Sequence, residues 1–207
     1  MSLELLLIIA FGGALLTYIL GKFSPRIRNS LAVIISLVLV AIVACLYGRS
    51  VEKTFYFGFF GLGLVLRLNM LSWFFAIAIS TLGTLSVIFS LSYMKDRERT
   101  DFYYLMLLLV NAAMLGIVFS GDLVSFFILW EIMSWSTFLL ISYNRGPALA
   151  AGMKYIIMSI VGSLAMLIGM LSLYTTYGTL NWPGWLYDFR NCLWDKPGHC
   201  WRHISYT

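Results

Sequence analysis

Long apolar runs separated by short charged segments dominate the chain. A helix that crosses a bilayer core of about 30 Å needs about 20 mainly apolar residues. Because backbone polar groups in lipid must bond within their own segment, the pattern predicts an all-α, polytopic helical membrane protein with about six transmembrane helices. The expected spans are residues 3–20, 30–47, 71–93, 102–119, 123–143 and 150–174.

The segment between the second and third spans has a different character. From Phe55 to Asn69 it is rich in aromatic residues and glycine, and it is too short for another crossing. Aromatic residues are enriched at the membrane–water interface. We expect a hairpin or an extended strand at the interface, with a loose interfacial loop as the alternative.

The composition excludes a soluble enzyme. The chain is 61% hydrophobic and 11% charged, whereas soluble domains carry about 25% charged residues. Its net charge of +5 comes from basic residues beside apolar spans, which indicates membrane topology and contact with lipid headgroups rather than nucleic-acid binding. The first span follows no basic segment and precedes no small-residue cleavage site, so we expect it to be retained.

The distribution of Lys and Arg predicts the orientation, because cytoplasmic loops carry the excess of positive charge. Three basic residues follow the second and fourth spans, namely Arg49, Lys53 and Arg67. Seven follow the first, third and fifth spans, namely Lys22, Arg26, Arg28, Lys95, Arg97, Arg99 and Arg145. The N-terminus is therefore predicted outside, although Arg190, Lys196 and Arg202 near the C-terminus reduce the bias.

Glu131 is the candidate for chemistry, because it lies near the middle of the fifth span. A carboxylate at that depth costs at least ~2.5 kcal/mol on membrane insertion. Such residues mark ion or proton paths, and this is our interpretation of Glu131. The alternative is a structural glutamate that bonds to Ser134 or to a neighbouring helix.

Two further charged residues are weaker candidates. Lys154 lies one or two turns into the sixth span, where its ammonium can reach the headgroups, and we assign it to the same proton or ion path. Asp122 opens the fifth span, where it suits a helix cap or the entrance of an ion path.

The last segment, residues 181–207, is predicted to be an interfacial or disordered tail outside a six-helix membrane domain at residues 1–180. Its Cys and His residues fit no zinc-binding spacing, so no metal is predicted, and an outer-side disulfide stays open. No phosphate-binding loop, nucleophile triad or haem-ligand pair appears along the chain, so no cofactor is expected. The Cys and His residues of this tail are Cys192, His199, Cys200 and His203.

Three separated motifs resemble the antiporter-like subunits of respiratory complex I, Mrp-type cation/proton antiporters and membrane-bound hydrogenases. The first is the Trp130-Glu131 pair within residues 120–142, which is similar to the family's fifth helix. Residues 150–163, with Lys154, resemble the start of the sixth helix, and residues 67–72 resemble the start of the third. The resemblance covers about residues 1–180, and the motifs occur in the family's order.

The resemblance implies a larger fold with two inverted repeats and broken helices at the ion path. Glu131 matches the key glutamate of the first repeat, whose lysine partner lies on a seventh helix that this chain does not reach. Lys154 matches a different basic position, and Asn69 stands where the family usually has Asp.

These matches imply a truncated, non-catalytic subunit of an energy-converting complex in the cell membrane. It would pack against other membrane subunits, including larger antiporter-like homologues, and contribute to or scaffold a proton or sodium path. A structural spacer without an ion path and an independent small ion transporter are the alternatives.

Overall fold

The structure is a computed structural model that describes residues 3–48, 51–57, 62–95, 97, 99–177 and 180. Within these residues, six helices are long and apolar enough to cross a membrane, which confirms the predicted all-α, polytopic architecture. The helices are α1 (Leu3–Gly21), α2 (Pro25–Cys45), α3 (Met70–Tyr93), α4 (Thr100–Phe119), α5 (Leu123–Ile141) and α6 (Pro147–Tyr177).

The helix boundaries agree with the predicted spans to within two residues, except at the N-terminus of α2 and at both ends of α6, which ends at Tyr177, three residues after the predicted span. Helix α2 begins at Pro25, five residues before the predicted span, and α6 begins at Pro147, three residues before it. Proline suits the first helical turn because its fixed φ matches the helix and its missing N–H would have no partner there. Hydropathy placed the start of α2 too late because Arg26 and Arg28 occupy its first turn.

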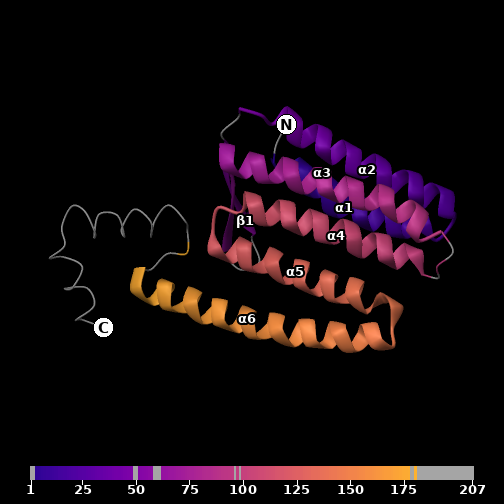
Figure 1. The fold of residues 1–207 in the computed structure, drawn as a ribbon. Helices are drawn as coiled ribbons and strands as arrows, with labels where there is room; N and C mark the ends of the chain where they lie inside the picture. The colour runs from indigo at the N-terminus through magenta and orange to yellow at the C-terminus, as the bar shows by residue number, and fades with distance from the viewer. Residues whose placement is uncertain are drawn as a thin grey trace.

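The helices lie side by side in alternating directions, with α4 in the middle (Figure 1). Helix α4 packs against α1, α3 and α5, and its fully buried Leu115 and Phe119 belong to the main hydrophobic core. Helix α6 packs against α5 and the short 3-10 turn η1 (Ser142–Asn144) at the edge of the bundle. The α5–α6 pair therefore forms the outer layer of the described fold.

A two-stranded hairpin lies at one end of the bundle (Figure 1). Strands β1 (Val51–Phe57) and β2 (Leu62–Leu68) pair antiparallel, with Val51 opposite Leu68. The hairpin prediction is confirmed, and its first strand begins four residues earlier than expected. A backbone bond from the Gly121 N–H to the Val65 carbonyl, 2.6 Å long, ties β2 to the turn between α4 and α5.

The opposite end holds the connections α1–α2, α3–α4 and α5–α6 (Figure 1). The seven basic residues of the predicted cytoplasmic set lie in or beside these connections. We call this the basic end; it comprises Lys22, Arg26, Arg28, Lys95, Arg97, Arg99 and Arg145. Residues 181–207, with Cys192, His199, Cys200 and His203, lie outside the described residues, and the boundary at residue 180 stays a prediction.

Candidate functional site on helices α5 and α6

Glu131 lies in the central part of α5. It follows Leu123 by eight residues and precedes Ile141 by ten, which places it roughly 12 and 15 Å from the two helix ends. Its side chain is half-buried, and its Oε1 atom is buried with no hydrogen-bond partner among the described residues. Among the described residues, this atom is therefore not bonded to Ser134.

The contact between α5 and α6 defines which way Glu131 faces. A Cβ atom on Gly152 would overlap the Ser142 Oγ atom and would lie 3.4 Å from the Phe138 ring. Helix α6 therefore approaches the end of α5 closely because Gly152 has no side chain. Glu131 precedes Phe138 by seven residues and Ser142 by eleven, or about two and three helical turns. Glu131 thus lies on the side of α5 that faces α6.

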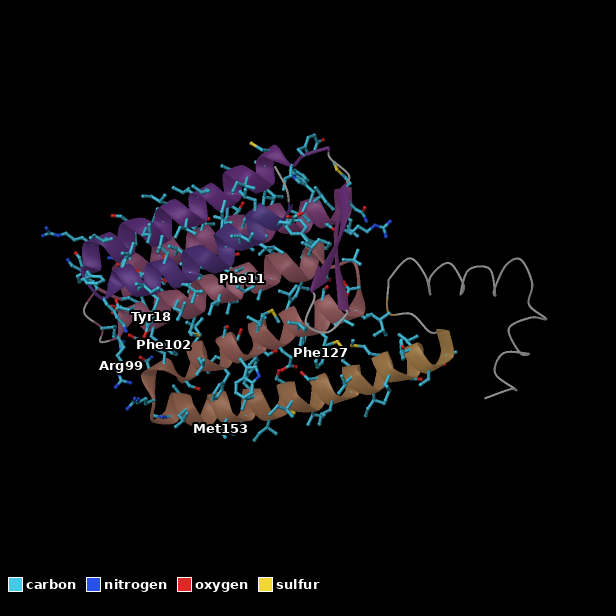
Figure 2. The ribbon with its side chains drawn as sticks, turned by 180° about the vertical axis from the view of Figure 1, so that it is seen from behind. Phe11, Tyr18, Arg99, Phe102, Phe127 and Met153 are labelled. Atoms are coloured by element: carbon cyan, nitrogen blue, oxygen red, sulfur yellow. The ribbon has the colours of Figure 1, made fainter. Side chains whose placement is uncertain are left out.

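Lys154 lies on the other side of α6. Gly152 and Ile156 are buried against the bundle, whereas Lys154, two residues from each, is exposed. Two residues correspond to about 200° around a helix. Figure 2 likewise shows the adjacent Met153, which is 47% exposed, at the outer edge of α6. The structure does not bring Lys154 and Glu131 together.

Asp122 has a different environment on the same helix. It is 1% exposed, and its Oδ2 atom accepts a 2.8 Å bond from the Ser125 backbone N–H, which is the geometry of an N-cap. Its Oδ1 atom accepts bonds from the Val65 backbone N–H, at 2.7 Å, and from the Ser125 hydroxyl. The Oδ1 atom therefore joins β2 to the first turn of α5, and the Oδ2 atom caps that turn.

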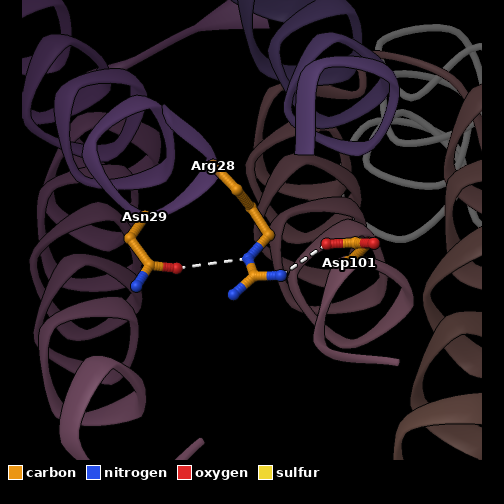
Figure 3. Close-up of polar contacts among 3 residues, drawn as sticks. All are labelled: Arg28, Asn29 and Asp101. Atoms are coloured by element: carbon orange, nitrogen blue, oxygen red, sulfur yellow. Dashed lines mark hydrogen bonds and ion pairs between the residues drawn. The ribbon is translucent and has the colours of Figure 1, made fainter. Parts of the chain in front are cut away.

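The structure adds an ion pair that the sequence did not suggest. The Arg28 Nη1 atom lies 2.5 Å from the Asp101 Oδ1 atom, and the Arg28 Nε atom donates to the Asn29 side chain (Figure 3). The guanidinium also lies over the Tyr104 ring. A Cβ on Gly21 would lie 3.1 Å from the Arg28 side chain, so Gly21 makes room for the pair. The available signal was Asp101, one residue before the predicted fourth span.

A second missed residue is Asn111, in the middle of α4. Both polar atoms of its amide are buried without a hydrogen-bond partner in the described part of the chain. The amide lies directly against Gly83 of α3, where a Cβ would overlap it. A lone Asn within an apolar run was the signal in the sequence, because such a residue must face the bundle interior.

Residues 120–190 match the family model described as "NADH:quinone oxidoreductase/Mrp antiporter, TM". A curated relative, Na(+)/H(+) antiporter subunit A1 of Staphylococcus aureus, is 32% identical over 169 residues, which are 77% of this chain and 21% of the relative. The chain thus spans about a fifth of the length of the curated relatives that it matches.

Solved structures share the fold. A chain of the membrane-bound sulfane sulfur reductase, an archaeal respiratory membrane complex, matches with a TM-score of 0.77 and 29% identity over 87% of this chain and 29% of that chain. A chain of the Mrp complex from Dietzia sp. DQ12-45-1b has a TM-score of 0.79 at 23% identity over 87% of this chain and 20% of its own. A chain of respiratory complex I from Thermus thermophilus, solved with bound aureothin, has a TM-score of 0.71 at 18% identity. The match covers 85% of this chain and 38% of that chain.

The motifs of α5 and α6, the family match and these relatives agree. The protein belongs to the antiporter-like membrane subunit family, whose members include subunits of Mrp and respiratory complexes. It is a multi-pass membrane protein of that class.

Proposed function

We propose that this chain supplies Glu131 as a proton- or sodium-binding residue to a translocation path in a multi-subunit complex of the cell membrane. The observation that carries the proposal is the central carboxylate whose Oε1 atom is buried without a partner. A carboxylate in hydrocarbon is costly, and a structural one is expected to have its oxygens hydrogen-bonded. Asp122 meets that expectation, whereas Glu131 does not.

The position of Glu131 suits an ion-binding role. It faces the neighbouring helix rather than the outer surface of α5, and ionisable residues on transport paths face the bundle interior or a water-filled cavity. A carboxylate oxygen without a hydrogen-bond donor is free to take up a proton or a sodium ion. The similarity to Na(+)/H(+) antiporter subunit A1 supports this class of ion.

The proposal includes an orientation. The basic end lies in the cytoplasm because it holds the excess of Lys and Arg, and α1 begins at the hairpin end, so the N-terminus lies outside. Helix α6 presents Lys154 on its outer face, where a neighbouring membrane subunit would meet it. We assign Lys154 to the path on that side, in contact with larger antiporter-like homologues.

The test is to measure sodium- or ΔpH-driven transport in membrane vesicles from host cells that express the chain together with its native partners. We expect Glu131→Gln to lower transport at least about 100-fold, as for a proton-transfer group, and Glu131→Asp to keep part of it. Thr137→Val, on the same helix, is the control and should transport normally. Co-purification of the partner subunits should be equal in all variants.

Unchanged transport in Glu131→Gln would contradict the proposal. It would leave Glu131 with a structural role and favour the spacer interpretation. Ion flux from the purified chain alone in liposomes would instead favour an independent transporter.

A further inference from the structure

Three buried oxygen atoms without hydrogen-bond partners belong to residues of α5, η1 and α6. They are the Glu131 Oε1, Ser142 Oγ and Ser163 Oγ atoms. In the described part of the chain, the other such side-chain atoms belong to Asn111, which lies against α3. Because unsatisfied buried polar atoms are rare in native proteins, each requires an explanation.

The antiparallel register places two of these atoms at one level. Ser142 meets Gly152 at the basic end. Glu131 lies eleven residues before Ser142, and Ser163 lies eleven residues after Gly152. Eleven residues span roughly 16 Å and about three full turns. Glu131 and Ser163 therefore lie at the same height on sides of the two helices that face each other.

Burial along α6 agrees with this register. Ile156, Ser163 and Met170, spaced seven residues apart, are 6%, 8% and 8% exposed. The residues that follow two of them, Ile157 and Leu164, are 56% and 54% exposed. Ser163 thus faces α5, while the neighbouring positions face outward.

The other charged residues on the packed elements lie away from this level. Asp101 is at the start of α4 and is paired with Arg28, and Arg67 is on β2 at the opposite end of the bundle. Lys154 is on the outer face of α6. On α6, Ser163 is the buried hydroxyl at the level of the carboxylate.

We propose that Ser163 is a positioning residue for Glu131, and this rests on the function proposed above. A serine hydroxyl both donates and accepts. Its O–H donates a hydrogen bond to the ionised carboxylate, and its oxygen accepts a hydrogen bond from the protonated carboxyl group. One side chain on α6 therefore holds Glu131 in both charge states.

The experiment is infrared difference spectroscopy of the intact complex in lipid, comparing samples at low and high pH. The carbonyl band of protonated Glu131 is assigned by its absence in Glu131→Gln. We expect Ser163→Ala to move that band to higher frequency because a hydrogen bond to the carboxyl group is lost. Ser163→Thr, which keeps the hydroxyl, should leave it close to its original position.

Ser172→Ala is the matched control, since Ser172 is an exposed serine on the same helix. The Glu131 carbonyl band should not move in this variant. Transport in Ser163→Ala should fall about 10-fold, as expected for loss of a hydrogen bond to a charged group. An unmoved band in Ser163→Ala, or no band that depends on Glu131, overturns the inference. Normal transport in Glu131→Gln would instead overturn the proposed function, so the two failures are distinct.

Discussion

The first four helices and the last two differ in how much of their surface the bundle covers. In an apolar stretch of 18 residues in each helix, 28% to 56% is buried in α1 to α4, against 17% in α5 and in α6. We call α1 to α4 the covered half and α5 with α6 the open half. The covered half contains the Arg28–Asp101 pair. The open half contains Glu131, whose Oε1 atom has no hydrogen-bond partner among the described residues. The buried ion pair and the candidate ion-binding carboxylate therefore lie in different halves of the molecule.

Breaking the ion pair should give the largest loss of stability. Asp101→Ala leaves the Arg28 guanidinium, in a residue 7% exposed, without its carboxylate. Removal of one partner from a fully buried pair costs about 3–5 kcal/mol. Because the Asp101 side chain is 29% exposed, we expect the free energy of unfolding to fall by about 2 kcal/mol. The loss is detected as a lower midpoint of thermal unfolding in detergent.

The control is the double variant Arg28→Met with Asp101→Ala. Replacing both charges removes the unpaired guanidinium, so the double variant should be more stable than Asp101→Ala alone. Equal stability of the two variants would show that leaving the Arg28 guanidinium without its carboxylate does not destabilise the protein.

The helices were predictable because each apolar run has the length of one membrane crossing. The start of α2 was not predictable from hydropathy, because the two arginines of its first turn have the composition of a loop. Nothing local shows that Asp101, 73 positions away, accepts the charge of Arg28. Such long-range pairing appears only once the helices are placed side by side.

The residues of the candidate site likewise differ in whether the sequence alone could predict them. Glu131 was identifiable from its depth within one span, which is a local property. Ser163 was not, because its relation to Glu131 depends on the register that the close Ser142–Gly152 contact sets. Lys154 was identifiable as a charge, but its place on the outer face follows from the burial of its neighbours on α6.

A smaller effect is expected where α3 meets α4. Gly83→Ala places a methyl group against the Asn111 amide. Overpacking of this kind costs about 1–3 kcal/mol, while the better helix propensity of alanine returns about 1 kcal/mol. We expect a net loss of about 1 kcal/mol in the same unfolding assay.

Asn111→Ala in the Gly83→Ala background should restore most of that loss, because the shorter side chain leaves room for the added methyl group. Wild-type stability of Gly83→Ala would mean that the Asn111 amide moves aside without cost. The tight contact would then not contribute to the rigidity of the covered half.

The smallest loss is expected for the same substitution in the open half. Gly169 lies on α6, and a Cβ built there meets no atom within 4 Å. Gly169→Ala should therefore cause no loss of stability in the purified chain, and it should raise the free energy of unfolding by up to about 1 kcal/mol through helix propensity alone. A loss as large as that of Gly83→Ala would contradict the contrast between the halves. Because one substitution is compared at two glycines, the difference between the results measures packing rather than helix propensity.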